Sequence, residues 1–281
     1  MLSSHPPDVT SPLPLVQHVT SLDIPDLQPY RTLRRPQDHL EQGIFVAEGE
    51  KVVRRLLHSG LPVLSMLLTD QWLEKTAEDI DRSPSAHIFI AERALLETIV
   101  GFRMHQGIMA VGRVPAEPQL DDLVRSSSSP RLFVALDGLV FAENVGVVVR
   151  NCAAFGVQGI FSGQTSASPY LRRAVRNSMG TVFQIPVVHT VDLPETLTAL
   201  QTIHGISSVV ADAHVETQVY DLDCRQDLCV IFGHEDSGVS RLVRKVAWKA
   251  IRIPMVEGVD SLNVASASAV VLAEISRQRA R

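Results

Sequence analysis

Three short segments in the second half of the chain combine glycine with polar residues directly after predicted strands. The first, residues 136–156, carries Asn144 and Arg150 on one predicted helix, roughly 120° apart around its axis. Asn144 is a suitable N-cap, and Arg150 lies among valines and alanines, where an arginine favours an anionic ligand or a catalytic role. The alternative is an ordinary surface arginine on the polar side of the helix.

The second segment, residues 230–240, runs from a β-branched strand into Gly233, Glu235 and Gly238. Glycine at the carboxyl end of a strand allows a ligand to approach the backbone, and α/β sheets bind ligands at that edge. The segment lacks both the G-K-[ST] of a Walker loop and the dinucleotide-binding G-x-G-x-x-G. By itself it indicates a tight turn as readily as a ligand loop.

The third segment, residues 251–281, places Ser261 just before a helix rich in alanine and serine. Ser261 is therefore predicted to be the N-cap of that helix. The small side chains of residues 262–272 permit close helix packing, which favours a subunit interface.

Strands that alternate with helices are predicted to position these segments. A long helix is expected from about Leu262 to Arg277, and helical stretches separate most of the strands, so the pattern predicts a mostly parallel sheet. The predicted strands cover residues 131–139, 157–163, 183–189, 205–213, 228–233 and 250–254.

The rest of the chain is predicted to form a second, smaller α/β domain with flanking segments. Residues 30–115 alternate short strands and helices, including a helix over residues 50–59 with an apolar face. Residues 116–130 contain a serine run between prolines and are predicted to be an interdomain linker, with room for a short helical turn inside it, before the domain of residues 131–281. Residues 1–29 are predicted to be a loosely ordered leader.

Composition narrows the class of protein. The 281 residues are 45% hydrophobic and 20% charged, which excludes a largely disordered or fibrous chain. There is no apolar run of roughly 18 residues to cross a bilayer, and the N-terminus is unlike a secretory signal. Cys152, Cys224 and Cys229 form no C-x-x-C pair, which favours a cytoplasmic location. A net charge of −5 weakens an RNA-binding hypothesis without excluding it.

In this order, the three segments resemble the signature motifs of the SpoU/TrmH family, in the SPOUT class of RNA methyltransferases. The resemblance covers residues 131–281, and residues 172–187 resemble the family's stretch between the first two motifs. One departure is Glu143, where many members carry proline before the asparagine. The matching residues are Asn144, Gly146, Arg150 and Ala154-Phe155-Gly156; Gly233, Glu235 and Gly238; and Ile253-Pro254-Met255 with Ser261-Leu262-Asn263-Val264.

The resemblance implies a parallel sheet with a trefoil knot, a homodimer, and methyl transfer from S-adenosylmethionine (AdoMet) to a ribose 2′-hydroxyl in RNA without a metal. Arg150 matches the family's catalytic arginine; because a guanidinium is a poor base, we expect it to bind the neighbouring phosphate and polarise the hydroxyl. In the family this arginine helps to build a composite site near the subunit interface. The implied catalytic residues are Asn144, Arg150, Glu235, Ser261 and Asn263. The implied cofactor-binding residues are Ala211, Gly233, Ile253, Leu262 and Asn263.

The first domain resembles, over a shorter stretch, the RNA-binding accessory domain of ribosomal-protein type that precedes many SpoU-type catalytic domains. That resemblance favours ribosomal RNA over transfer RNA as the substrate. Its basic residues are predicted to follow a phosphate backbone, with a merely solvated surface as the alternative. These residues are Arg31, Arg34, Arg35, Lys51, Arg54 and Arg55.

Other functions stay open at this point. Within the class, the alternatives are a transfer-RNA 2′-O-methyltransferase and an enzyme that methylates an antibiotic site on ribosomal RNA. A catalytically silent RNA-binding scaffold is a further alternative, against which the intact polar motif residues argue. A dinucleotide-dependent oxidoreductase would need a G-x-G-x-x-G motif that the chain lacks.

Overall fold

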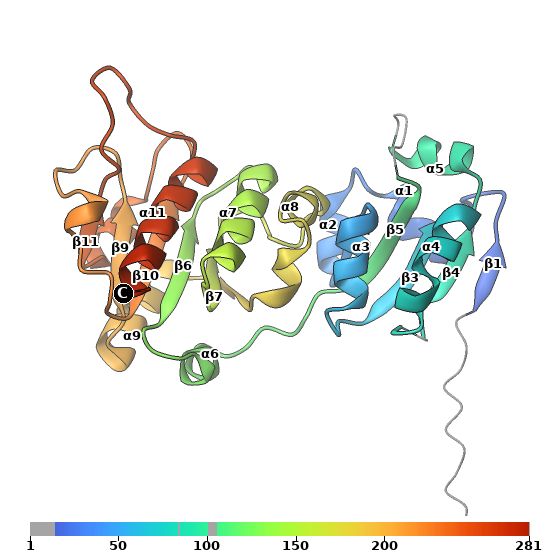
Figure 1. The fold of residues 1–281 in the computed structure, drawn as a ribbon, viewed down its shortest axis with the longest axis horizontal. Coiled ribbons are helices and arrows are strands. Elements are labelled where there is room, and N and C mark those ends of the chain that lie inside the picture. The colour runs from blue at the N-terminus through green and yellow to red at the C-terminus, as the bar shows by residue number, and fades with distance from the viewer. Residues whose placement is uncertain (1–14, 84, 101–105, 281) are drawn as a thin grey trace, which may run out of the picture. The chain divides into compact units, whose positions relative to one another are not determined.

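The computed structural model describes residues 15–83, 85–100 and 106–280, and it divides the chain into two compact units (Figure 1). The first unit is Met1–Val114 and the second is Pro115–Arg281. No helix in the described ranges combines the length and the apolar character needed to cross a membrane.

The first unit is built on a mixed five-stranded sheet with the order β1-β4-β3-β5-β2. Strands β1, β4 and β3 are parallel, and β5 is antiparallel to both β3 and β2. The strands are β1 (Val16–His18), β2 (Ile44–Glu48), β3 (Val63–Leu68), β4 (His87–Ile90) and β5 (Ile108–Arg113). The helices are the 3-10 turn η1 (Pro25–Leu27), α1 (Gln28–Arg31), α2 (Pro36–Glu41), α3 (Glu50–Leu57), α4 (Asp70–Ile80) and α5 (Arg93–Val100).

The prediction of a loosely ordered leader over residues 1–29 is wrong for residues 15–29. Strand β1 adds to the edge of the sheet beside β4, and Leu27 is fully buried. The adjoining Tyr30 is also fully buried, and its hydroxyl makes a 2.9 Å hydrogen bond with the Ser65 hydroxyl. Val19, Leu27 and Tyr30 are therefore part of the core of the first unit; residues 1–14 lie outside the described residues.

The second unit contains a six-stranded, entirely parallel sheet with the order β11-β9-β10-β6-β7-β8, which confirms the predicted parallel arrangement. One boundary differs, because Thr181–Gln184 forms a 3-10 turn and the strand expected from residue 183 begins at Val187. The strands are β6 (Leu132–Asp137), β7 (Gly159–Gly163), β8 (Val187–Thr190), β9 (Ser207–Ala211), β10 (Leu228–Gly233) and β11 (Lys249–Ile251). The main helices are α6 (Leu120–Ser126), α7 (Ala142–Ala154), α8 (Arg172–Asn177), α9 (Leu193–His204), α10 (Arg241–Val246) and α11 (Val264–Arg279).

Helices cover the parallel sheet, as expected for strands that are apolar along their whole length. Helices α6, α9 and α10 share one apolar core with alternate residues of β6 and β10, such as Phe133 and Ile231. Helices α7 and α11 lie side by side (Figure 1). Asn151 of α7 joins them, because its side-chain amide donates to the carbonyl of Ala265 and the hydroxyl of Ser268, both at 2.9 Å.

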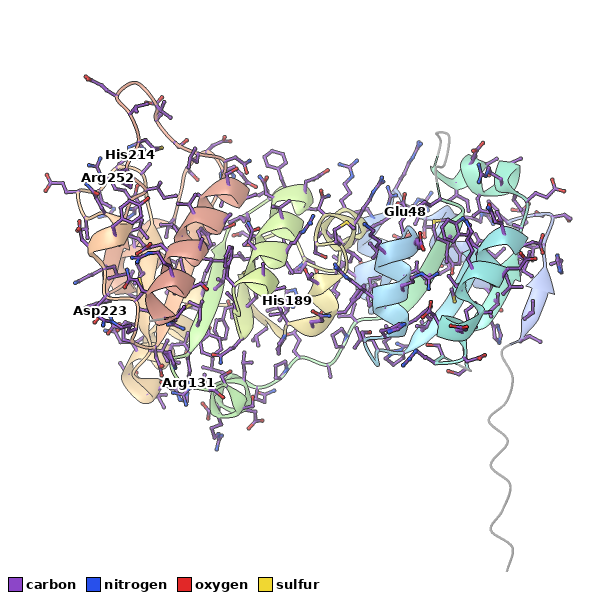
Figure 2. The ribbon with its side chains drawn as sticks, in the orientation of Figure 1. Glu48, Arg131, His189, His214, Asp223 and Arg252 are labelled. Carbon is purple, nitrogen blue, oxygen red and sulfur yellow. The ribbon has the colours of Figure 1, made fainter. Side chains whose placement is uncertain are left out.

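The predicted linker at residues 116–130 contains the helical turn that the prediction allowed for, but this turn is packed into the second unit. The turn is α6, whose Leu123 and Val124 are buried in the core of the second unit. Arg131 fixes the end of the segment: its side chain donates to the Val124 carbonyl at 3.1 Å and forms a 2.7 Å ion pair with Asp227 (Figure 2). Helix α6 is thus an integral part of the second unit.

Candidate active site

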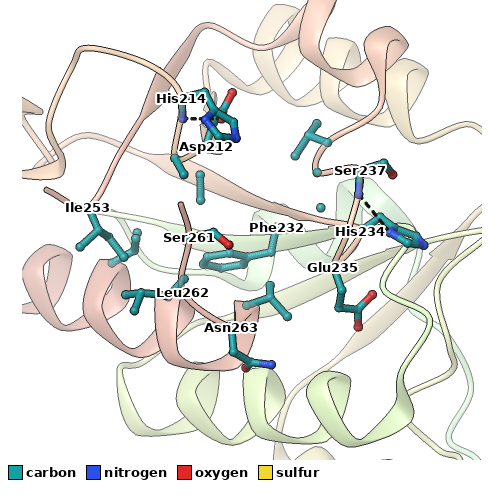
Figure 3. Close-up of a pocket in the computed structure, with 18 of the residues that line it drawn as sticks. Asp212, His214, Phe232, His234, Glu235, Ser237, Ile253, Ser261, Leu262 and Asn263 are labelled. Carbon is teal, nitrogen blue, oxygen red and sulfur yellow. Dashed lines mark hydrogen bonds between the residues drawn. The ribbon is translucent and has the colours of Figure 1, made fainter. Parts of the chain in front are cut away.

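A cavity of about 310 Å³ lies at the carboxyl ends of the central strands of the second unit (Figure 3). Phe232 and Gly233 at the end of β10 form one part of its wall, and Ala211 at the end of β9 forms another. The loop that follows β11 and leads into α11 closes the cavity with residues 261–263. All three loops meet because parallel strands bring their carboxyl ends to one edge of the sheet.

Gly233 is required by the turn that follows β10. His234 and Gly238 exchange backbone hydrogen bonds of 3.0 and 2.9 Å, which close a narrow loop. A Cβ atom on Gly233 would lie only 2.3 Å from the carbonyl carbon of Gly238 and from the backbone nitrogen of Val239. Gly238 itself has a φ of +69°, in the left-handed region that favours glycine. The turn therefore exposes backbone to the cavity and presents Glu235.

The Glu235 carboxylate lies at the amino end of α7. It accepts hydrogen bonds from the backbone nitrogens of Val140 and Phe141, at 3.2 and 3.3 Å, and from the side-chain amide of Asn144 at 2.9 Å. Burial by itself would raise the pKa of Glu235, but these hydrogen bonds outweigh it and hold the pKa below the usual value. The partial positive charge of the helix end favours the same ionised form. Glu235 is therefore a carboxylate at neutral pH.

Asn263 extends this network into the third motif. Its side-chain amide donates to the Oδ1 atom of Asn144 at 3.2 Å, while its own Oδ1 accepts from the backbone nitrogen of Ala265 at 2.9 Å. Glu235, Asn144 and Asn263 thus form one chain of hydrogen bonds that links the three segments singled out in the sequence. Both asparagines are held in a single orientation by these partners.

Two N-cap predictions are wrong. Helix α7 begins at Ala142, so Asn144 lies inside its first turn, and Glu235 supplies the acceptor at the helix end instead. Helix α11 is capped by Asn263 and not by Ser261, which lies exposed on the cavity wall. In both places the helix start depends on a network that reaches beyond the local sequence.

Arg150 is placed apart from the other predicted catalytic residues. Asn144, Glu235, Ser261 and Asn263 line or adjoin the cavity, whereas Arg150 is exposed on α7 and is not among the residues that line it. Within the described part of the chain, no hydrogen bond or ion pair holds its guanidinium. The side chain is thus available to a group from outside this subunit.

All five residues predicted to bind the cofactor line the cavity: Ala211, Gly233, Ile253, Leu262 and Asn263. Sequence reasoning missed other polar residues of the same wall. Asp212 forms an ion pair with Arg244 and accepts a 2.9 Å hydrogen bond from the backbone nitrogen of His214. Burial would raise the pKa of Asp212, but the His214 N–H and the Arg244 guanidinium together lower it. The signal available in the sequence was an aspartate directly after a buried strand.

No metal centre accompanies this cavity within residues 15–83, 85–100 and 106–280, where no three or more His, Cys, Asp or Glu side chains are grouped to hold an ion. Among the polar residues at the cavity, Asp212 is paired with Arg244, and Glu235 and Asn263 are both hydrogen-bonded to Asn144.

The basic residues of the first unit that are predicted to bind RNA differ in their contacts and exposure. Arg54 joins α3 to α4, because it forms ion pairs with Glu50 and Asp79 and donates to the Lys75 carbonyl at 2.7 Å. Arg31 forms a 3.1 Å ion pair with Asp23. The other four predicted RNA contacts have exposed side chains: Arg34, Arg35, Lys51 and Arg55.

Comparison with known proteins identifies the family. Residues 131–273, just over half of the chain, match the model of the SpoU rRNA Methylase family. An "uncharacterized tRNA/rRNA methyltransferase" of Mycobacterium avium (strain 104) is 37% identical over 256 residues, which are 88% of this chain and 81% of the relative.

Two solved structures resemble both units of the chain. The SpoU methyltransferase AviRb from Streptomyces viridochromogenes, in complex with the cofactor AdoMet, is 25% identical with a TM-score of 0.80 and covers 90% of this chain and 97% of its own. The AdoMet-bound rRNA methyltransferase from Sinorhizobium meliloti is also 25% identical with a TM-score of 0.80, over 93% and 98% of the two chains. The motif network, the family match and these relatives together assign the chain to the SpoU rRNA methylase family, a family of RNA methyltransferases.

Proposed function

We propose that this protein transfers the methyl group of AdoMet to a ribose 2′-hydroxyl of RNA, with ribosomal RNA as its substrate. The observation that carries the proposal is the hydrogen-bond chain from Glu235 through Asn144 to Asn263 at the edge of the cavity. It joins the three motif segments beside a pocket in the position where parallel sheets bind ligands. The related AviRb and Sinorhizobium meliloti structures, both of which hold AdoMet, support the same cofactor here.

The residues of the cavity fit AdoMet. Its volume of about 310 Å³ is at the lower end of the range for small-molecule pockets. Phe232, Ile253 and Leu262 provide apolar wall, while Asp212 and Arg244 provide charged groups for the polar ends of such a ligand. When bound, AdoMet supplies a methyl group already activated by its sulfonium. The protein's own task is then to exclude water and orient the acceptor hydroxyl, and orientation alone can contribute several kcal/mol.

Arg150 is proposed to act in the active site of a partner subunit. It is exposed on α7 and lies outside its own chain's cavity, so a second copy of the chain would bring it to a cavity. Val140, Phe141 and Leu262 are 47%, 54% and 40% exposed beside the hydrogen-bond chain, an apolar surface that a subunit interface would cover. There the guanidinium would bind the phosphate beside the target ribose and polarise the hydroxyl.

Two further properties of this protein are proposed. The trefoil knot of the C-terminal segment is proposed from the family resemblance. A cytoplasmic location is proposed from the three cysteines, which are all buried as free thiols and suit a reducing compartment.

Calorimetry and RNA mapping test the proposed function. We expect AdoMet to bind and NAD to give no heat, because the chain has no G-x-G-x-x-G segment. Ribose-methylation mapping of total RNA, with and without the gene, should then reveal one 2′-O-methyl group lost from ribosomal RNA. Loss of a methyl group from transfer RNA alone would contradict the proposal that ribosomal RNA is the substrate. Binding of NAD would contradict the proposal that the reaction is methyl transfer from AdoMet.

The pKa of Glu235 predicts a dependence of stability on pH. Since the folded protein holds this pKa below its ordinary value of 4.5, the ionised carboxylate stabilises the native state above that value. The contribution is lost as the pH falls through the lowered pKa. We expect Glu235→Gln to lower the free energy of unfolding at neutral pH and to match the wild-type protein in strong acid. Urea unfolding over that range measures the difference, and a difference independent of pH would contradict the assignment.

The first unit is proposed to provide affinity for RNA. A chain that begins at Pro115 retains α6 and the whole core of the second unit, so we expect it to fold and to bind AdoMet normally. It should bind RNA more weakly and with a smaller salt dependence, because it lacks the phosphate contacts of the first unit. Filter binding at several salt concentrations measures both. If the shortened chain binds RNA as tightly as the full chain, the basic residues of the first unit do not contact RNA and are only exposed to solvent.

A further inference from the structure

Glu143 has a specific partner. It lies in the first turn of α7, next to Asn144, and its Oε1 atom accepts a 2.9 Å hydrogen bond from the Nη1 atom of Arg173 on α8. The two side chains are 47% and 70% exposed.

The α7–α8 contact that carries this pair is close. A Cβ atom on Gly146 would lie 2.4 Å from the carbonyl oxygen of Ala174 and 2.8 Å from the Cβ of Asn177, so the two helix backbones touch at that point. Glu143 and Arg150 are seven residues apart, which places them on nearly the same side of α7 with a rise of about 10 Å between them. Arg173 is therefore held at a fixed place on the side of α7 that also carries Arg150.

We propose that Arg173 binds a phosphate of the substrate RNA close to the one bound by Arg150, and that Glu143 occupies Arg173 until RNA displaces it. The inference rests on the proposed function, since it takes RNA as the substrate. An exposed ion pair is worth only about 0–1 kcal/mol, so it opens readily. A phosphate offers Arg173 a bidentate, charge-assisted contact that is stronger.

Glu143 would in this way determine specificity. Its carboxylate neutralises Arg173 in the free enzyme and so reduces attraction to RNA that presents no phosphate at this place. RNA that does present one gains the contact at the cost of opening the Glu143–Arg173 pair. The carboxylate acts on RNA through Arg173, not by direct contact, and this distinction can be tested.

A double-mutant cycle on the exposed pair provides the test, with a fluorescein-labelled oligouridylate as the probe, because phosphate contacts are independent of sequence. We expect Arg173→Gln to weaken binding and to reduce the slope of log K against log salt by roughly 0.7–0.9. Glu143→Gln should tighten binding by about three- to fivefold, the size expected from an exposed pair. In the Arg173→Gln background, Glu143→Gln should have no effect.

A matched control is Asp223→Asn. Asp223 forms a comparable exposed ion pair with Arg225 at 3.0 Å, but it precedes the amino end of β10, away from the cavity at the carboxyl end (Figure 2). The Asp223→Asn substitution removes one negative charge, as Glu143→Gln does. We expect it to leave the affinity for RNA unchanged. Circular dichroism checks that each variant is folded.

Two results would overturn the inference. If Arg173→Gln binds the oligouridylate as wild type does, the pair is only a surface contact. If Glu143→Gln tightens binding equally with and without Arg173, the carboxylate merely repels RNA through space. AdoMet calorimetry on the wild-type protein separates these failures from failure of the proposed function, because cofactor binding does not involve either residue.

Discussion

Replacement of Arg150 by alanine should reduce methyl transfer at least about 100-fold, the loss typical when a group that stabilises charge in the transition state is removed. AdoMet affinity should stay within a few-fold of wild type, because Arg150 is exposed and does not line the cavity of its own chain. Single-turnover transfer of a radiolabelled methyl group measures the first quantity, and calorimetry measures the second. Arg150→Lys is the matched control: it keeps the charge without the bidentate geometry, so it should retain part of the activity.

Mixing two inactive variants tests where Arg150 acts. Asn263→Ala removes the N-cap of α11 and the hydrogen bond to Asn144, and it should be inactive as a homodimer. In a heterodimer with Arg150→Ala chains, one of the two composite sites regains both residues, so part of the activity should return. If heterodimers are confirmed by sedimentation and no activity returns, Arg150 does not act across the interface. An equal loss of AdoMet affinity and activity in Arg150→Ala would also contradict its proposed role.

The parallel sheet and the wall of the cavity could be predicted from the sequence because their signals are local. Apolar strands that alternate with helices indicate a parallel sheet, and glycine at the end of β10 indicates a close approach of backbone. The order of the three motifs then identified the loops that meet at the carboxyl edge. The residues implied for the cofactor, such as Gly233 and Leu262, consequently all line one cavity.

The helix starts could not be predicted, because they depend on residues distant in the sequence. Glu235 bonds to Asn144 across 91 positions, which leaves Asn144 inside the helix and not at its cap. Asp212 and Arg244, 32 positions apart, form an ion pair that no spacing rule reveals. Arg54 looked like part of a basic surface, yet Asp79 on the next helix binds it. Charge pairing of this kind is decided by tertiary packing.

Two segments are more ordered than predicted, for a related reason. Residues 15–29 and 116–130 are rich in proline, serine and aspartate, a composition typical of loops. A few apolar side chains outweigh that composition once a core is available: Leu27 is buried in the first unit, and Leu123 in the second. Fully burying one such side chain contributes about 1.5–3 kcal/mol, which offsets the entropy of ordering only one or two residues, so several buried side chains act together in each segment.

Gly233→Ala should weaken the binding of AdoMet and destabilise the second unit. The added Cβ would lie 2.3 Å from backbone atoms of Gly238 and Val239, and a backbone contact cannot be relieved by changing a rotamer. The turn must therefore open, which breaks the hydrogen bonds between His234 and Gly238 and displaces Glu235 from the end of α7. We expect AdoMet affinity to fall at least about tenfold and the free energy of unfolding to fall by about 1–3 kcal/mol, the usual cost of overpacking. Calorimetry and urea unfolding measure the two effects.

Gly205→Ala distinguishes this steric effect from the general cost of losing a glycine. Gly205 ends α9 with a φ of +69°, and a Cβ placed on it would have no atom within 4 Å. The substitution should cost about 1–2 kcal/mol of backbone strain and leave AdoMet affinity unchanged, because the residue is remote from the cavity wall. If Gly233→Ala also binds AdoMet normally while both variants lose similar stability, the turn after β10 does not form the cofactor site. If only Gly233→Ala loses affinity, the close approach of backbone at this strand end is what the cofactor requires.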